Sequence, residues 1–173
     1  MASPTYTLIN TVTVPTGGSA NVTFSSIPAT YKDLLIKLSA RTTSNYGNTF
    51  AQSNMAVNAT GNNGDKVLFG YNGTANSNTG GIGSTYGVNS NTSTANTFGN
   101  TEFYILNYTG STTKFLSTDG VAESNSSTAP IVSLNANTFN VTSAITSVTI
   151  TPETSAGSFA EYTTAYLYGI KNS

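Results

Sequence analysis

Apolar and polar residues alternate along much of this chain, which is the pattern of β-strands with one buried face. The stretch Leu34, Ile36 and Leu38 is one example, with apolar residues at every second position. No window shows the three- and four-residue spacing of an amphipathic helix. The alternation predicts strands over residues 6–14, 20–24, 34–40, 55–59, 67–71, 102–108, 114–122, 131–134, 144–151 and 159–170.

Turn residues separate these runs. Pro15–Ser19 has the character of a hairpin turn, Asn62–Asp65 precedes another run, and Asn107–Ser111 closes a third. Short strands with such turns and no helices between them predict an all-β fold, an antiparallel two-sheet sandwich of jelly-roll type. A length of 173 residues fits one domain over 1–173. The predicted buried positions are Leu8, Phe24, Leu34, Ile36, Leu38, Phe103, Ile105, Val148, Ile150 and Leu167.

One stretch does not fit this pattern. Residues 70–100 are rich in Gly, Asn, Ser and Thr and carry little alternation, which predicts a long loop. A passive excursion is one interpretation, because the composition is of low complexity. Binding loops, however, also set rigid rings and apolar side chains among small polar residues. We therefore expect partner contacts from Tyr71, Ile82, Tyr86, Val88 and Phe98, with the three aromatic residues as anchors.

The composition argues against an enzyme. Histidine and cysteine are absent, which removes the usual proton shuttle, the thiolate nucleophile and the common ligands of zinc. Seven Asp and Glu residues are present, and any two could meet as a glycosidase pair, but none carries a recognisable motif. Asn62–Asp65 lacks the acidic repetition of a calcium loop, so a plain turn is favoured there. We expect no catalytic residue, no cofactor and no metal.

Charge is scarce, and this bears on the partners. Six Lys and Arg residues against seven Asp and Glu residues give a net charge of −1, which disfavours a nucleic-acid partner. The longest apolar runs are three residues, so no membrane span is expected. The start of the chain has neither a basic flank nor an apolar stretch, so we expect synthesis in the cytoplasm without a signal peptide. So few charges give little repulsion between copies of the chain, which favours a protein that works inside an assembly. We expect it to associate with itself as a homo-trimer.

Three segments resemble a group of small β-rich virion proteins of tailed phages that infect aquatic bacteria. They are residues 24–34 (FSSIPATYKDL), 97–108 (TFGNTEFYILNY) and 166–173 (YLYGIKNS). The resemblance spans nearly the whole chain, with the middle stretch as its variable part. These motifs carry no catalytic residues.

The resemblance implies a virion component, either a capsid decoration (cement) protein or a fibre-type module. A decoration protein would bind and stabilise the shell of the major capsid protein, or contact other virion proteins. The alternative is a tail-fibre or appendage module that binds a host-surface receptor or glycan. The chain has no heptads, collagen-like repeat or shaft repeat of the kind that builds a fibre, which favours decoration.

Overall fold

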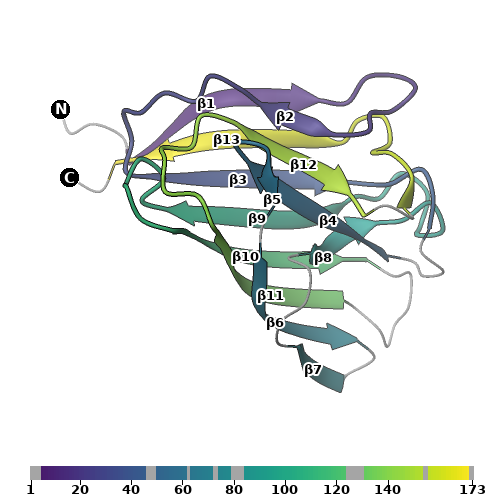
Figure 1. Cartoon of the computed structure of the whole chain (residues 1–173). Coiled ribbons are helices and arrows are strands. Elements are labelled where there is room, and N and C mark those ends of the chain that lie inside the picture. The colour runs from purple at the N-terminus through teal and green to yellow at the C-terminus, as the bar shows by residue number, and fades with distance from the viewer. Residues whose placement is uncertain are drawn as a thin grey trace.

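The computed structural model describes residues 5–45, 50–61, 63–71, 74–78, 84–123, 131–153 and 156–171. Within these ranges the regular structure is β, as the alternation predicts (Figure 1). The strands are β1 (Tyr6–Thr13), β2 (Val22–Phe24), β3 (Asp33–Ala40), β4 (Phe50–Val57), β5 (Thr60–Gly61), β6 (Asn63–Tyr71), β7 (Thr74–Asn78), β8 (Ser84–Asn89), β9 (Gly99–Leu106), β10 (Lys114–Ala122), β11 (Ile131–Phe139), β12 (Val148–Pro152) and β13 (Thr164–Ile170).

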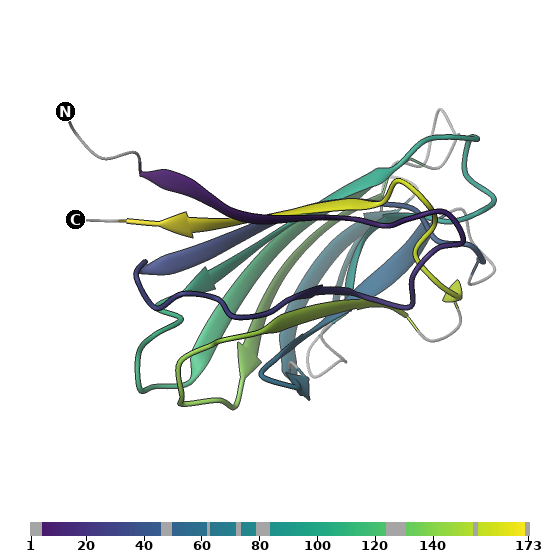
Figure 2. The same ribbon diagram turned by 90° about the horizontal axis from the view of Figure 1, so that it is seen from above.

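Two antiparallel sheets form an open sandwich, which confirms the predicted fold class. Over the described residues, the larger sheet has eight strands in the order β1-β13-β3-β9-β10-β11-β6-β7. The smaller sheet has the order β2-β12-β4-β5, and β8 also pairs with β4. Figures 1 and 2 show that the smaller sheet covers one face of the larger sheet and leaves the opposite face without a second layer.

The core lies between the sheets and consists of alternate side chains from both. Of the ten positions predicted to be buried, all but Leu8 lie in it. Tyr108, Phe139 and Phe159 add large buried rings that the alternation did not single out. Alternation identifies the buried face wherever a strand is regular, because successive side chains point to opposite faces of a sheet.

The prediction for Leu8 is wrong, and the cause is a β-bulge. Leu8 is 52% exposed, whereas Ile9 packs partly against the core. Leu8 pairs with Tyr168 and Asn10 pairs with Leu167, so Ile9 is an extra residue in β1. An extra residue changes which face the following side chains take. Leu8 therefore points outward and Val12 and Val14 point inward. In a strand without a bulge all three would share one face, because their positions differ by even numbers.

Strand β8 lies close against the larger sheet, and glycine makes this possible. A side chain at Gly120 of β10 would overlap the carbonyl oxygen of Tyr86 in β8. Hydroxyls then connect the layers: Ser133 Oγ donates to the Tyr86 carbonyl at 2.6 Å, and Thr85 Oγ1 lies 3.1 Å from Thr118 Oγ1. The inner surface is polar at this point, so these bonds satisfy groups that would be costly to bury alone.

Three local predictions need correction. Pro15–Ser19 is a turn, with Gly18 N donating to the Pro15 carbonyl, but it carries the chain from one sheet to the other and closes no hairpin. Residues 63–65 belong to β6 and form no turn, because Asn63 and Gly64 continue its pairing with β11 and Asp65 lies at a register shift between them and Lys66. The last strand begins at Thr164, since Tyr162 has a left-handed backbone (φ 68°) that interrupts an extended strand.

Truncation of one buried and one exposed phenylalanine should separate the two faces of the larger sheet. Phe103 is 1% exposed and Phe115 is 55% exposed. We expect Phe103→Ala to lower the free energy of unfolding by about 3–5 kcal/mol, because a cavity remains in the core. Phe115→Ala should change it by no more than about 0.5 kcal/mol. Equal losses in urea titrations would contradict the assignment of inner and outer faces.

A second pair of variants tests the close approach of β8. Gly120→Ala should lower the free energy of unfolding by about 1–3 kcal/mol or more, because the new methyl group meets backbone that cannot move easily. Gly61→Ala is the matched control, since the space around Gly61 is open. Its effect should stay within about 0.5 kcal/mol. If Gly120→Ala were as well tolerated as the control in thermal unfolding, the described packing of β8 would be wrong.

Candidate contact face

Of the five predicted contact residues, the structure describes the side chains of Tyr86, Val88 and Phe98. Val88 lies in β8 and is fully buried, so its side chain belongs to the core. Tyr86 is half-buried in the same strand, with its ring edge-on to Phe50 at 5.6 Å between centroids. Phe98 is half-buried just before β9. Tyr71 ends β6, where its backbone pairs with Thr74 and its side chain is outside the description; Ile82 lies outside the described residues.

A continuous loop over 70–100 is wrong, because the stretch contains β7 and β8. The segment between β8 and β9 is held by contacts within the chain. Nη1 of Arg41 donates to the carbonyls of Thr94 and Thr97 at 2.7 and 3.1 Å. Nη2 donates to the carbonyls of Asn91 and Ser93, both at 3.1 Å. One guanidinium thus orders four residues of this segment, so no external partner is needed to order it.

Residues of the three segments 24–34, 97–108 and 166–173 meet at one end of the sandwich. The Tyr108 hydroxyl, after β9, donates to the Pro28 carbonyl, and burial raises its pKa. The ring of Tyr31 lies against Gly169 of β13, where any side chain would overlap it. The Lys171 ammonium lies 5.9 Å from the centre of the same ring. The glycine in the last segment is therefore required by the tyrosine in the first.

A buried carboxylate completes this end. Asp33 is almost inaccessible and accepts hydrogen bonds from the Tyr104 hydroxyl at 2.9 Å and from Asn107 N at 2.7 Å. Lys32 Nζ donates to Asn107 Oδ1 at 2.8 Å. Both oxygens of Asp33 are thus occupied by groups of its own chain. These contacts give the motif residues a role in packing, and the hydrogen bond to Asp33 orients the Tyr104 ring.

The outer face of the larger sheet, the face away from the smaller sheet, is unusually apolar. With one exception, the exposed large hydrophobic residues of the described chain lie there; the exception is Tyr162, in a turn. Exposed single hydrophobics are ordinary, but a contiguous set marks a surface that contacts something. The exposed residues of this face are Tyr6, Leu8, Leu106, Phe115, Val121, Val132, Leu134 and Tyr166.

Strand register arranges this face in two rows that cross six strands. In the first, the tyrosine row, the residues paired from β1 to β11 are Leu8, Tyr168, Leu35, Tyr104, Ser117 and Ala136. In the second, the charged row, they are Thr11, Tyr166, Lys37, Glu102, Asp119 and Leu134. Bulky side chains occupy the β1–β13 half of the tyrosine row, and small ones occupy the β10–β11 half.

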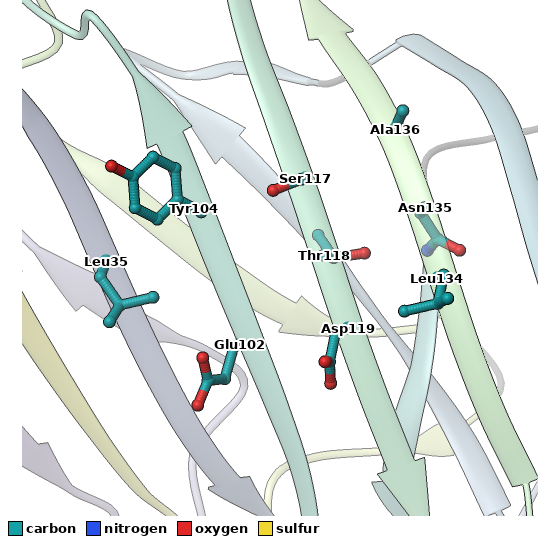
Figure 3. Close-up of a pocket in the computed structure, with 9 residues that line it drawn as sticks. All are labelled: Leu35, Glu102, Tyr104, Ser117, Thr118, Asp119, Leu134, Asn135 and Ala136. Carbon is teal, nitrogen blue, oxygen red and sulfur yellow. The ribbon is translucent and has the colours of Figure 1, made fainter.

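The small residues leave a hollow of about 460 Å³ over β9, β10 and β11, which Figure 3 shows between Leu35 and Leu134. Tyr104, Glu102, Ser117, Asp119 and Ala136 line it. A neighbouring depression of about 340 Å³ shares Leu35 and Glu102 and continues to Tyr6 and Tyr168. The result is a shallow trough across the face, with apolar walls and few charges.

The charges at the centre of the face are unevenly paired. Lys37 Nζ donates to Glu102 Oε1 at 2.6 Å, and this hydrogen bond raises the pKa of Lys37. Glu102 is also directly opposite Asp119 on the neighbouring strand. Like charges in that position are unfavourable. Among the described residues, no hydrogen bond or ion pair to Asp119 is found, so its carboxylate is open to a donor from outside.

Other site types find little support in the described ranges. No group of three or more His, Cys, Asp or Glu side chains is placed there to hold a metal ion. No helix in the same ranges has the length and apolar character needed to cross a membrane. The outer face was not predicted from the sequence, because its residues lie between core residues of the same strands and only the core positions were considered there. A signal was present: some strands carry apolar residues at adjacent positions, as in Leu34-Leu35-Ile36 and Phe115-Leu116, so both of their faces are apolar.

Replacement of Arg41 should loosen the segment between β8 and β9. Arg41→Lys keeps the charge but cannot span four carbonyls, because an ammonium lacks the planar fork of a guanidinium. The amides of Ser93 and Thr97 donate within the segment and report on its opening. Loss of one charged hydrogen bond, about 1.5 kcal/mol or more, should speed their hydrogen exchange about tenfold. Amides of β13 are the internal control, and unchanged exchange at Ser93 and Thr97 would contradict the clamp.

The face and the fold can be set beside known proteins. No protein-family model, no curated protein and no solved structure matches this chain. Its function is therefore argued from its own side chains.

Proposed function

We propose that this protein is a structural component of a phage particle, a decoration protein that stabilises the capsid shell. The observation that carries the proposal is the outer face of the larger sheet. Its exposed leucine, valine and aromatic side chains, with only a few charges at the centre, have the composition of a protein–protein interface core. Contact of this apolar surface with water is unfavourable in free energy, and a neighbouring protein subunit that covers the face removes that contact.

The scarcity of charge supports the same function. Thirteen formally charged side chains are spread over 173 residues, so the protein has little long-range repulsion to keep copies apart. A shell is held by many repeated contacts, each of them weak, and their number supplies the strength. The resemblance of the three segments to virion proteins points to the same setting. The decoration role is favoured over a fibre because no shaft repeat is present.

A second function has one observation in its favour. The hollow over β9 and β10 combines the Tyr104 ring with two carboxylates, Glu102 and Asp119, and the Ser117 hydroxyl. An aromatic face can stack on the apolar side of a sugar ring, and carboxylates accept hydrogen bonds from its hydroxyl groups. An appendage module that binds a host glycan would use the trough in this way. The larger apolar surface around the hollow favours the protein interface.

Antibody labelling of intact particles tests the proposal. We expect label on the head. We also expect that Phe115→Ser combined with Leu134→Ser lowers the number of copies per particle about tenfold or more, because two exposed apolar contacts are lost. Thr23→Ser, on an exposed position of the smaller sheet, is the control and should leave the copy number unchanged.

The location of the label decides between the two functions. Label on the tail only, with glycan binding that Tyr104→Ala abolishes, would replace decoration by the appendage function. Particles without any label would contradict both.

A further inference from the structure

We propose that the outer face of the larger sheet binds the same face of a second copy of this chain. This inference rests on the proposed function, because it names the neighbour that covers the face. The two copies are related by a two-fold axis that runs parallel to the strands, between β3 and β9. An axis in this position places β3 over β9, β13 over β10 and β1 over β11 of the second copy.

Shape is the first argument for this pairing. The tyrosine row is bulky on β13 and β1, where Tyr168 and Leu8 project, and small on β10 and β11, where Ser117 and Ala136 leave the hollow. The two-fold axis brings the bulky half of each copy over the small half of the other. Tyr168 then faces Ser117, and Leu8 faces Ala136. The hollow of about 460 Å³ receives side chains from the second copy, and each copy fills the other in the same way.

The central pair of the row also matches. Leu35 and Tyr104 are cross-strand neighbours on either side of the proposed axis. Leu35 of one copy, which is 8% exposed and lines the hollow, therefore faces Tyr104 of the other, and the Tyr104 hydroxyl is already held by its hydrogen bond to Asp33. A ring fixed before binding loses little freedom when it is covered, which favours association.

Charge is the second, independent argument. Lys37 and Glu102 lie on either side of the axis, so each lysine faces the glutamate of the second copy and four charges alternate in sign at the centre. Asp119 faces Tyr166, which is 39% exposed and whose hydroxyl can donate to the open carboxylate. No pair of like charges is opposed across this interface. A two-fold axis perpendicular to the strands would instead place β3 of one copy over β3 of the other. In a register where Lys37 faces Lys37, the two positive charges would repel each other.

Paired sheets of this kind satisfy the usual geometry. Aligned sheets pack about 10 Å apart with their strands inclined at about 30°, so the strands of the two copies lie about 15° to either side of the two-fold axis. That inclination moves the outermost pairs of each row out of register and leaves the pairs beside the axis close to it. The contacts from Lys37, Glu102, Leu35 and Tyr104 consequently matter most.

A cysteine cross-linking test reads the geometry directly, because the natural chain contains no cysteine. Facing cysteines on sheets about 10 Å apart are too distant for a direct disulfide, but a short bifunctional thiol reagent can join them. Ser117→Cys and Tyr168→Cys are purified separately, mixed at micromolar concentration and treated with that reagent. The proposal expects a covalent dimer in the mixture and little in either variant alone. In each homodimer the two identical cysteines are three strand spacings apart along the sheet, about 14 Å or more, which is further than the short reagent reaches. A mixture of Thr23→Cys with Tyr168→Cys is the control and should not cross-link.

Sedimentation of the unmodified chain completes the test. We expect a dimer, and Ser117→Arg, which fills the hollow, should weaken self-association about a hundredfold, a loss of about 2.7 kcal/mol. Thr23→Arg carries the same charge on the smaller sheet and should leave the dimer intact. A monomer, a trimer, or a dimer whose mixed cysteine variants fail to cross-link would overturn the proposal.

These results are separable from the fate of the proposed function. A chain found on particle heads that is monomeric and does not cross-link overturns the pairing and leaves the decoration function standing. A cross-linked dimer that is absent from particles supports the pairing and overturns the function. If glycan alone binds the trough of a monomeric chain, the pairing is overturned.

Discussion

The packing of the two sheets against each other is the constraint on which this structure depends. Each strand of the larger sheet must send alternate side chains into the space between the layers, where Phe103, Ile105 and Leu116 are buried. Because the pleat has a period of two, the residues between them must point the other way. Leu35, Tyr104 and Phe115 therefore point away from the space between the layers. The apolar outer face is a direct consequence of apolar residues at both parities of the same strands.

Where the two layers come closest, space is the limiting quantity. Strand β8 fits against β10 because Gly120 has no side chain, and the hydroxyls of Ser133, Thr85 and Thr118 supply hydrogen bonds in a region where apolar packing is interrupted. Buried polar groups with partners fix one arrangement of the layers more strictly than apolar contacts do. The position of β8 in turn fixes the start of the segment that Arg41 holds. The segment between β8 and β9, which the sequence predicts to be part of a long loop, is thereby held by contacts with its own chain.

One end of the sandwich and the outer face have different roles. The motif residues Tyr31, Tyr108 and Gly169 contact one another, and Asp33 binds groups of its own chain, so this end is a closed packing arrangement. The outer face is the opposite case, since its trough and the open carboxylate of Asp119 leave contacts to be made. The link between them is Tyr104, whose hydroxyl is held by Asp33 while its ring lines the trough. Packing at the end of the sandwich thus fixes the position of a side chain that lines the trough.

The sequence by itself determined the fold class and most of the core, because alternation reports directly which side chains share a face. It located a strand at each predicted run, and it placed Phe24, Leu34 and Ile150 inside. It could not locate the bulge at Ile9, since one extra residue in a strand leaves no local signal, and Leu8 was assigned to the wrong face for that reason. It also missed β8, whose pairing partner and glycine contacts are distant in sequence. The candidate site was decided by tertiary structure alone: the trough exists because Leu35, Tyr104, Ser117 and Ala136 come from four strands in register, and register is a property of the paired sheet.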